Sequence, residues 1–580
     1  MEESKLISVL QQDWALFECY KVHNPKVIWA DHSLIVDDNA ESVVSYYRNL
    51  IQEHAYVIKD TPSFAEIKLD PSDTKAFTAE RYGGWGIGKN GGGGRCGNSG
   101  KYQLKGIGAN CMVGEHDDQI HKYGGLDAPL AIIEIINTYL LTALLPLGAV
   151  KIRGLILIGE ESAIYHHPAN RCWGVIMLRD NCMRPAHFMR APLFEPRSKY
   201  SSRLSCDVAR IRRLNKVLLK SFKDPNEFVR YLGTFLASCA DQFGFARAAR
   251  IMHGTLSPSN ITMGGQWLDL PLATLLVGGI NQSLSSDFYT EHAAPVDYAF
   301  ELLHGFSKYN GLQLNPAPLA NYYAEQFDAH FRMHIGFVLG IEQFVERVGS
   351  TKWNAITEAF DAVIHSAVNF TTREISANDN DPVHALIVVF FVSVYSSESA
   401  QPFLSQAKIS KINGQRIMDH SLEIMDAVWN LHKTENSFRI KNKHHFFVGM
   451  ALVALKRAYL SAVFFSPLVA ENIWNLCQSK TTDAVIPLID CYRGLIDWIF
   501  DTPNEQIILF QSDVMRIAYK LSEGIYSIER SGVHLKCVSC YGELLAYLGA
   551  IDRSDFIVEN FCFFDFFLKL ERIIPLMRSS

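Results

Sequence analysis

Residues 253–269 read HGTLSPSNITMGGQWLD, and this stretch places Asn260 and Asp269 nine positions apart. The Thr-Met-Gly-Gly segment between them is turn-prone, so we expect a tight hairpin that returns the carboxylate to the side of the amide. Amide and carboxylate oxygens on adjoining backbone segments suit Mg²⁺, which keeps several waters and is usually shared with substrate phosphates. Because ordinary loops also contain Asn and Asp, this pair indicates a metal site only in combination with the segments before it.

A glycine run followed by a lysine lies upstream. Residues 83–108 read GGWGIGKNGGGGRCGNSGKYQLKGIG. Glycine lets backbone N–H groups approach phosphate closely, and the planar guanidinium of Arg95 suits phosphate oxygens. The Tyr-Gln-Leu-Lys segment predicts a strand that carries Lys105. A flexible linker is the alternative, but the strand and the long apolar helix that follow favour nucleotide binding.

That helix is predicted over residues 127–148, which read DAPLAIIEIINTYLLTALLPLG. Pro129 in the first turn and the closing Pro-Leu-Gly are typical helix boundaries. The segment is nearly long enough to span a membrane, but Glu134 and Asn137 lie within it, so we expect a buried helix. A buried carboxylate is costly unless it is paired, and Lys105 is the obvious partner of Glu134.

The order of these segments resembles that of the selenoprotein O family, kinase-like proteins that transfer AMP instead of phosphate to proteins. The family pattern has a Gly-x-Gly-Arg loop, a Leu-Lys-Gly strand, a helix Glu, two arginines, and a His-Gly-x-x-Asn-Thr-Asp-Asn loop followed by an Asp. The matching positions fall within about residues 80–275 and are Gly92-Gly93-Gly94-Arg95, Leu104-Lys105-Gly106, Glu134, Arg179, Arg184, His253-Gly254, Asn260 and Asp269.

The resemblance implies an α+β fold with a protein-kinase-like bilobal nucleotide-binding core, and it implies ATP and Mg²⁺ as cofactors. It makes Lys105, Glu134 and Asp269 the catalytic residues, with Lys105 on the nucleotide phosphates and Glu134 as its partner. It assigns the phosphate loop to Gly92, Gly94 and Arg95, the distal phosphates to Arg179 and Arg184, and Mg²⁺ to Asn260 and Asp269. His253 occupies the position of a histidine that orients the loop.

The chain departs from the family pattern at several positions. Ser259 stands where the family has an Asp proposed as the base, and Leu270 replaces the glycine after the metal Asp. The two arginines are also closer together than in the family, which makes Arg184 the less certain of the pair. An insertion after Lys105 contains Glu115, His116, Asp117, Asp118 and His121. We interpret it as a solvated polar loop rather than a metal site.

The loss of the base suggests which acceptor the protein uses. A carboxylate is already ionised at neutral pH and needs no deprotonation, so it would give an acyl adenylate. More loosely, the chain resembles the maturation proteins of siderophore-carrying microcins, which act with a small acyltransferase partner on a peptide C-terminus. Alternatives are AMP transfer to a hydroxyl group, a phosphotransferase, for which Ser259 is unfavourable, and a non-catalytic pseudokinase scaffold.

The 580 residues predict three regions. Residues 1–75 form an N-terminal extension with strand-like segments, residues 76–300 form the nucleotide-binding core, and residues 301–580 are mostly helical. Segments that support this division are the strand-like 43–51, 54–60, 151–159 and 171–178, the helical 327–348 and 418–434, and a loop boundary at 377–382.

Composition excludes some classes of protein. The net charge of −6 without a basic stripe argues against nucleic acid as a partner. The acidic, polar N-terminus is unlike a signal peptide, and the apolar run 384–396 is too short to span a bilayer. We therefore expect a cytoplasmic protein without a membrane span, acting on a protein or peptide. The twelve cysteines show no framework spacing. Cys537 and Cys540 form a lone CxxC, for which the resemblance keeps a redox role open.

Overall fold

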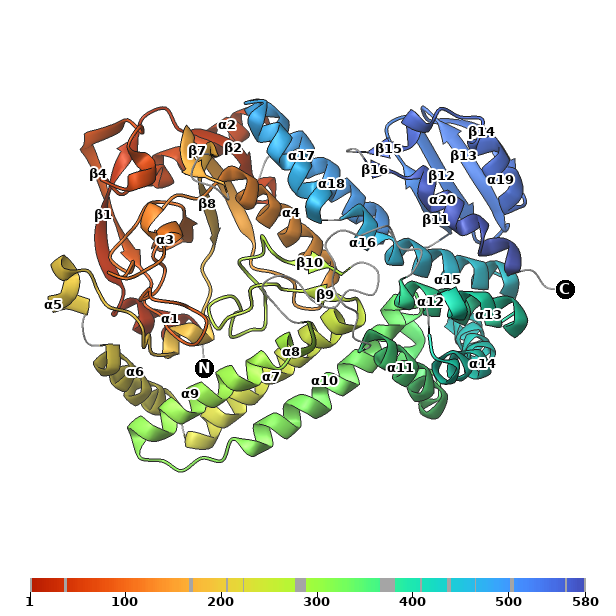
Figure 1. Cartoon of the computed structure of the whole chain (residues 1–580), viewed down its shortest axis with the longest axis horizontal. Coiled ribbons are helices and arrows are strands. Elements are labelled where there is room, and N and C mark those ends of the chain that lie inside the picture. Colours follow the sequence, from red (N-terminus) through yellow and green to blue (C-terminus); the bar gives the residue numbers. More distant parts are fainter. Residues whose placement is uncertain are drawn as a thin grey trace.

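The computed structural model describes residues 3–35, 39–165, 170–204, 207–222, 224–276, 288–365, 381–406, 409–435, 440–464, 466–500, 505–558 and 561–577. Helices contain 54% of the residues and strands contain 18%, so the protein is of mixed α and β class. In Figure 1 the strand-rich N-terminal part and the small C-terminal sheet lie at opposite ends, and long helices run along one side. These helices are α7 (Pro225–Ala248), α9 (Ala294–Asn310) and α10 (Ala317–Val338).

The N-terminal part contains an eight-stranded sheet with the order β2-β7-β8-β6-β5-β4-β1-β3. All its strand pairs are antiparallel. The strands of residues 1–75 belong to the same sheet as the later strands that carry the candidate site. Their bounds are β1 (Ala15–Val22), β2 (Lys26–Ala30), β3 (Tyr56–Val57), β4 (Leu69–Ala79), β5 (Cys96–Asn98), β6 (Tyr102–Lys105), β7 (Ile152–Ile164) and β8 (Arg171–Asp180).

The strands predicted at Lys105, 151–159 and 171–178 are confirmed as β6, β7 and β8. The strand expected over 43–51 is wrong, because these residues lie in helix α2 (Ala40–His54). The Asn39 side chain caps this helix by accepting a hydrogen bond from the Ser42 N–H at 2.9 Å. Leu50 and His54, one turn apart, form its buried side. The capped, amphipathic helix thus overrides the weak strand preference of the β-branched and aromatic residues in the segment.

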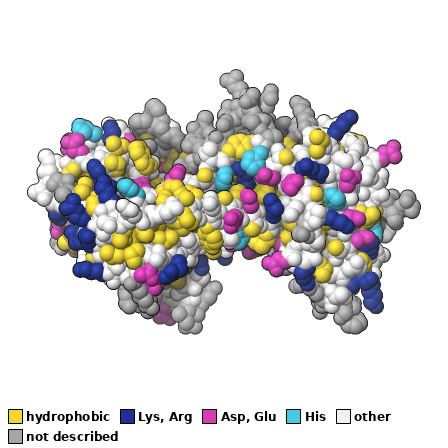
Figure 2. All heavy atoms as spheres, turned by 90° about the horizontal axis from the view of Figure 1, so that it is seen from below, with side chains coloured by type: hydrophobic (Ala, Val, Ile, Leu, Met, Phe, Trp, Pro, Cys, Tyr) yellow, Lys and Arg dark blue, Asp and Glu magenta, His cyan; other side chains and the backbone are white. Residues whose placement is uncertain are grey.

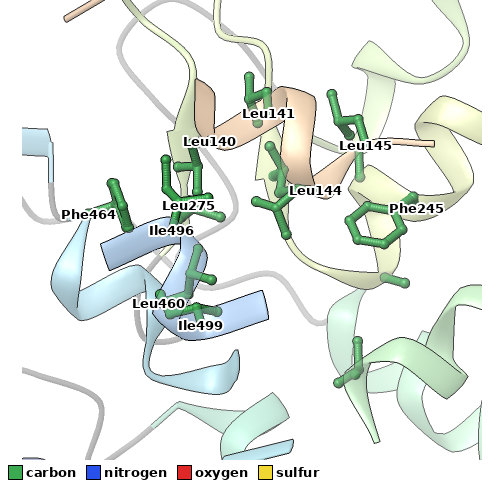
Figure 3. Packing of buried hydrophobic residues seen from close by; sticks show 14 of the residues in the cluster. Leu140, Leu141, Leu144, Leu145, Phe245, Leu275, Leu460, Phe464, Ile496 and Ile499 are labelled. Atoms are coloured by element: carbon green, nitrogen blue, oxygen red, sulfur yellow. The ribbon is translucent and has the colours of Figure 1, made fainter. Parts of the chain in front are cut away.

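The buried helix predicted over 127–148 is confirmed as α4 (Ala128–Leu144), capped by the Asp127 side chain. Most of its residues are apolar because the helix is covered on two opposite sides. Strands β7 and β8 contact one side, and α17 (Ser466–Gln478) and α18 (Val485–Phe500) contact the other. Figure 3 shows its leucines, Leu140 and Leu144 among them, packed with side chains of the C-terminal helices. Each fully buried leucine contributes about 1.5–3 kcal/mol to stability.

Shorter elements connect the sheet to the long helices. They are α1 (Glu3–Gln11), α3 (Gln119–Tyr123), α5 (Ser201–Leu204), α6 (Asp207–Ser221), α8 (Phe288–Glu291) and the strand pair β9 (Ile251–Met252) and β10 (Thr274–Leu275). The helix predicted over 327–348 is interrupted: α10 ends at Val338, and Gly340 adopts a left-handed conformation with φ 67° before a short 3₁₀ turn.

The C-terminal region contains further helices and a small sheet that the sequence pattern does not reveal. The helices are α11 (Ser350–Ile364), α12 (Pro382–Ser393), α13 (Ser397–Gln406), α14 (Lys411–Glu435), α15 (Lys443–Ala458), α16 (Leu460–Val463), α19 (Tyr541–Leu548) and α20 (Phe564–Glu571). Four antiparallel strands form the sheet: β11 (Gln506–Gln511), β12 (Met515–Lys520), β13 (Ile525–Arg530) and β14 (Val533–Val538). A short pair, β15 (Ile557–Val558) and β16 (Phe561–Cys562), follows.

Two apolar stretches are relevant to whether the chain contains a membrane-spanning helix. The run 384–396 lies largely in α12, whose side chains are almost all buried. Among the described helices, Lys443–Val463 alone has the length and hydropathy of a membrane span, and 78% of its apolar window is buried inside the protein. A core helix passes the same test, so this stretch is weak evidence for a membrane span.

Candidate functional site

The hairpin predicted between Asn260 and Asp269 is present. The Asn260 carbonyl accepts a hydrogen bond from the Leu268 N–H at 3.1 Å, and the Thr262 N–H donates to the Gln266 carbonyl at 2.9 Å. As a result, Asn260 and Asp269 line the same cavity. The structure thus brings the two proposed metal ligands to one place.

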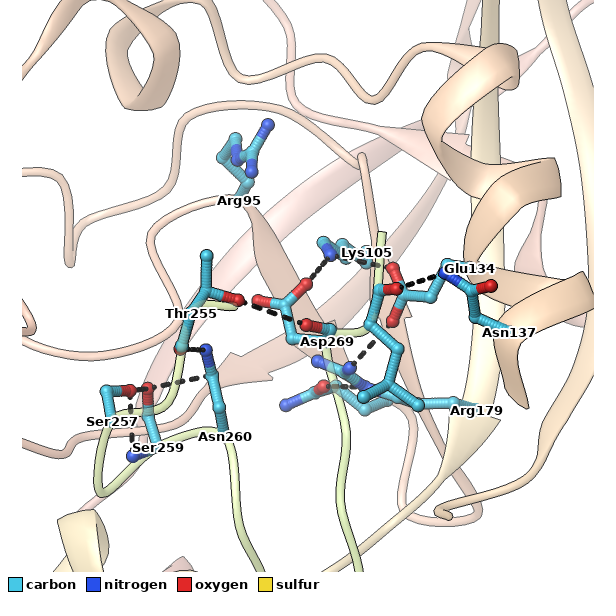
Figure 4. Close-up of polar contacts among 12 residues, drawn as sticks. Arg95, Lys105, Glu134, Asn137, Arg179, Thr255, Ser257, Ser259, Asn260 and Asp269 are labelled. Atoms are coloured by element: carbon cyan, nitrogen blue, oxygen red, sulfur yellow. Dashed lines mark hydrogen bonds and ion pairs between the residues drawn. The ribbon is translucent and has the colours of Figure 1, made fainter. Parts of the chain in front are cut away.

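Local contacts fix both side chains (Figure 4). The Asn260 amide nitrogen donates to the Thr255 carbonyl at 2.8 Å, and the Ser259 hydroxyl donates to the Asn260 amide oxygen at 3.1 Å. The His253 ring lies 3.1 Å from the Asn260 carbonyl, in keeping with an orienting role. Asp269 has φ 62°, a left-handed conformation that is uncommon outside glycine and often occurs at functional sites.

Lys105 lies between two carboxylates (Figure 4). Its ammonium group is 3.0 Å from Glu134 Oε2 in α4, as predicted, and it also pairs with Asp269. Glu134 in turn lies 3.4 Å from Arg179, whose Nε donates to Gln103 Oε1 at 2.6 Å. The strand lysine, the helix glutamate and the loop aspartate therefore form one contiguous network, in which Lys105 and Glu134 are buried and Asp269 is partly exposed.

The charges in this network stabilise one another. Burial alone would raise the pKa of Asp269, but the positive charges of Lys105 and Arg179 more than offset it and hold that pKa well below its ordinary range. For Lys105, burial lowers the pKa while Asp269 and Glu134 raise it, with a net increase. Lysine and aspartate are therefore both charged at neutral pH, as phosphate and metal binding require.

Helix α4 positions the loop as well as Lys105. Asn137, one turn after Glu134, donates from its amide nitrogen to the Leu270 carbonyl at 2.8 Å and to the Ala273 carbonyl at 3.2 Å. The backbone just beyond Asp269 is thus tied to the helix that holds Lys105. Sequence reasoning noted Asn137 only as a polar residue in an apolar helix, and its position three residues after Glu134 was the available signal.

The cavity has a volume of about 350 Å³. All the predicted site residues except Glu134 line it, namely Gly92, Gly94, Arg95, Lys105, Arg179, Arg184, Asn260 and Asp269. Four of these side chains are cationic, and among the described lining residues only Asp269 carries a carboxylate. Behind the lining, Glu134 pairs with Lys105 and Arg179, and Glu80 pairs with Arg184, so four cations face three carboxylates and one positive charge is left in excess. A concave site of net positive charge suits an anionic ligand such as a polyphosphate.

The glycine run forms a packed wall of the cavity. Gly92 has φ 152°, and a Cβ there would lie 1.9 Å from the Glu80 carbonyl oxygen, so only glycine fits. The N–H groups of Gly93 and Gly94 donate to the carbonyls of Glu80 and Gly92 at 3.1 and 2.8 Å. Because these N–H groups bond within the protein, an anion bound in this cavity would be contacted mainly by the cationic side chains. Two of these, Arg95 and Arg184, also donate to backbone carbonyls, those of Gly125 and Ser259, each at 3.1 Å.

A buried carboxylate that sequence reasoning missed, Glu80, lies behind the cavity. Arg184 is 3.3 Å from Glu80, His187 is 3.4 Å away, and Gln103 donates to it at 2.7 Å. Burial raises the pKa of Glu80, but the charge of Arg184 and the contact with His187 lower it to about 2. Gln103 contacts both Glu80 and Arg179 and so links the two networks. The only signal was a charged residue directly after Phe77 and Ala79, the buried apolar residues at the end of β4.

The pH dependence of stability should report the Glu80 carboxylate. Because its pKa is lowered, its contribution is complete above the ordinary value of 4.5 and is lost as the pH falls towards about 2. We expect Glu80→Gln to lower the free energy of unfolding at neutral pH by about 3 kcal/mol. We also expect the stability of this variant to decline less steeply than that of the wild type between these two pH values.

Urea denaturation at several pH values measures both effects. The exposed Glu115→Gln is the control, and an equal pH profile in both variants would contradict the assignment.

The insertion after Lys105 is less solvated than expected. Asp117 is buried and contacts the His121 ring at 3.1 Å, and His121 lines the cavity. Asp118 is exposed and accepts a hydrogen bond from the His121 N–H at 2.8 Å. The donor atoms of these three side chains lie close enough together for a metal, but the aspartates also bond to backbone N–H groups of their own turn.

The cysteine pair lies outside the cavity. Cys537 and Cys540 are free thiols, the first exposed, and Cys537 Sγ lies 3.4 Å from the His534 ring. Two adjacent histidines in the sequence, His166 and His167, and most of the expected boundary at 377–382 fall outside the described residues.

Comparison with known proteins adds no relative. No protein-family model matches the chain, and no curated protein matches it.

Proposed function

We propose that this chain is a kinase-like nucleotidyltransferase that transfers AMP from ATP to a protein or peptide acceptor, with Mg²⁺ as cofactor. One observation carries the proposal: Lys105 on β6, paired with Glu134 on α4, meets Asp269 at the cavity that Asn260, Arg179 and Arg184 also line. Protein kinases combine a strand lysine, a helix glutamate and metal-binding Asn and Asp in the same way. A kinase-like bilobal core is part of the proposal.

The donor set fits the metal and the nucleotide. Asn260 and Asp269 offer an amide and a carboxylate oxygen, the ligand types that Mg²⁺ prefers. When bound, Mg²⁺ would neutralise negative charge on the phosphate oxygens. Lys105, Arg179 and Arg184 supply positive charge for the phosphates, and arginines that hold the distal phosphates stabilise pyrophosphate as the leaving group.

The environment of Ser259 favours a carboxylate acceptor. Its hydroxyl contacts Ser257 at 2.8 Å and donates to Asn260, and a serine hydroxyl is no useful base at neutral pH. A carboxylate oxygen can attack the α-phosphorus without losing a proton, giving an acyl adenylate and pyrophosphate. A peptide C-terminus is the proposed acceptor, with a small acyltransferase to use the adenylate, as in the siderophore-microcin maturation proteins that the chain resembles.

Labelled ATP tests the proposal directly. With candidate peptides and Mg²⁺, ATP labelled at the α-phosphate should label the acceptor and release pyrophosphate, whereas ATP labelled at the γ-phosphate should not label it. Sensitivity of the product to hydroxylamine would identify an acyl adenylate. Transfer of the γ-label with release of ADP would show a phosphotransferase and contradict the proposal.

The main alternative is a nucleotide-binding scaffold without turnover. The ion pair between Lys105 and Asp269 favours it, because a metal at Asp269 must compete with the ammonium group. ATP binding without release of either pyrophosphate or ADP, in the presence of an acceptor shown to bind, would support this alternative.

Replacing Ser259 tests whether the loop supplies a base. We expect Ser259→Ala to change the rate of AMP transfer by less than about 3-fold, since a catalytic base typically contributes about 100-fold or more. Pyrophosphate release under saturating ATP measures this rate. A loss of 100-fold or more, on the same scale, would show that Ser259 takes part in proton transfer and would remove the argument for a carboxylate.

A further inference from the structure

The long helices α7 and α10 carry a second cluster of chemically active side chains. Asp241 on α7 faces His330 and His334 on α10. Asp241 Oδ1 lies 2.7 Å from His334 Nε2 and 3.2 Å from His330 Nδ1. The two imidazole rings are nearly parallel, with an interplanar angle of 18°.

We infer that Asp241, His330 and His334 form a binding site for a transition-metal dication, Zn²⁺ above all, that ties α7 to α10. The proposal is independent of the nucleotide chemistry. It uses three ligands from two helices, with a fourth position left for water.

The spacing of the two histidines is the first support. Residues four apart on a helix lie on one face, and a His pair at this spacing is a common zinc-binding arrangement. The donor atoms of the three side chains all lie within 4.8 Å of one another. In a tetrahedral site with Zn–N and Zn–O bonds of about 2.0–2.1 Å, ligand atoms are about 3.3 Å apart. The 3.2 Å distance from Asp241 to His330 is close to this separation, whereas the 2.7 Å distance to His334 is that of a hydrogen bond, which metal binding would lengthen.

The chemistry of the donors selects the metal. Two imidazole nitrogens and one carboxylate oxygen suit Zn²⁺ and related transition metals, whereas Mg²⁺ and Ca²⁺ prefer oxygen ligands alone. His330 Nδ1 is buried and approaches Asp241 in a geometry that departs from a hydrogen bond. The side chains of Asp241 and His330 are each 26% exposed and that of His334 is 13% exposed, so the cluster lies where the helix interface meets solvent.

The packing of the two helices holds the ligands in place. Gly244, one turn after Asp241, faces α10, and a Cβ there would lie 2.9 Å from the Cβ of His330. The missing side chain lets the helices approach closely at this level. On the other side of His334, the Phe245 ring makes an edge contact with the imidazole at 5.1 Å between centroids. The site is therefore built into the helix interface and is not an accident of mobile surface side chains.

The location suggests what the metal does. Helix α7 ends at Ala248, about two turns beyond Asp241, and the chain continues through β9 to His253 and the loop of the candidate nucleotide site. Fixing α7 against α10 stabilises the base of that loop. Figure 2 shows the side of the molecule along which the long helices lie, with histidine and acidic side chains close together near its middle.

Metal titration of the full-length protein tests the site. After removal of metal with a chelator, we expect Zn²⁺ to bind with a stoichiometry of one and a Kd of about 1 µM or lower, and to raise the Tm. Co²⁺ in its place should give the intense visible absorption of a four-coordinate complex. In His334→Gln we expect Zn²⁺ affinity to fall at least about 100-fold and the rise in Tm to disappear.

Matched variants separate this site from others. His334→Cys keeps a zinc ligand and should retain binding, which shows that a loss in His334→Gln reflects ligation and not misfolding. His365→Gln removes an exposed histidine that pairs with Asp361 on its own helix and should have no effect. Cys537→Ser removes the exposed thiol beside His534, a second contact between side chains of zinc-ligand type, and should leave the affinity unchanged.

The proposal is overturned if Zn²⁺ binds His334→Gln as tightly as the wild type. It is equally overturned if Cys537→Ser loses the metal, or if the wild type with its native circular dichroism spectrum binds no Zn²⁺ at micromolar concentration.

Discussion

In an Asp269→Asn variant we expect AMP transfer to fall at least about 1,000-fold, equivalent to about 4 kcal/mol of transition-state stabilisation. Asp269 is the only carboxylate among the described residues that line the cavity, and the amide that replaces it cannot supply the negative charge that holds Mg²⁺. The ion pair with Lys105 would also be lost, which frees the ammonium group for the phosphates. Affinity for ATP should therefore change much less than turnover, by no more than about 10-fold.

The measurement is pyrophosphate release with saturating acceptor, together with ATP affinity from calorimetry. Glu115→Gln, at an exposed position outside the cavity lining, is the control and should keep the wild-type rate. An Asp269→Asn variant that keeps wild-type turnover would exclude Asp269 as the metal ligand. A wild-type protein that binds ATP without any turnover in the presence of a bound acceptor would favour the scaffold.

Glu134→Ala should be strongly destabilising even if the protein is no enzyme. Glu134 is 2% exposed and pairs with both Lys105 and Arg179, so its loss leaves two cations buried beside one carboxylate. Removing one partner of a buried ion pair typically costs about 3–5 kcal/mol. Native-state hydrogen exchange of the amides in β6 and β8 measures this loss in the sheet that carries the two cations.

The control for this prediction is an exposed pair in the same part of the chain. Glu53 contacts Lys75 at 2.5 Å with most of its side chain in solvent. Exposed pairs contribute about 0–1 kcal/mol, so Glu53→Ala should leave the exchange rates nearly unchanged. Similar effects of the two substitutions would mean that the Glu134 network adds no more to stability than an exposed pair.

Much of the candidate site was predictable because its elements are encoded locally. The turn residues between Asn260 and Asp269 specify a hairpin, and a run of apolar residues with Pro129 near its start specifies helix α4. Pairing Lys105 with Glu134 required only the rule that a buried charge needs a partner. The same reasoning failed for residues 43–51, where strand preferences of single residues lost to a helix cap and an amphipathic face.

Other features could not be read from the sequence, because they depend on which distant segments meet. Glu80 matters because Arg184 and His187 fold against it, and neither is close to it in sequence. The sheet β11–β14 consists of short segments between helices, without a clear alternating pattern.

By itself, then, the sequence determined the local parts of this protein: a lysine on a strand, a glutamate in a buried helix, and an amide and a carboxylate on one hairpin. Turn chemistry, capping and the cost of an unpaired charge act over a few residues and can be read from them. Only the tertiary structure decided that Asp269 contacts Lys105 and that Asp241 meets His330 and His334. It also decided that most glycine N–H groups of residues 83–108 donate hydrogen bonds within the protein. Such contacts join residues that are far apart in the sequence. Which of these residues meet depends on how the helices and strands pack and on which side chains become buried.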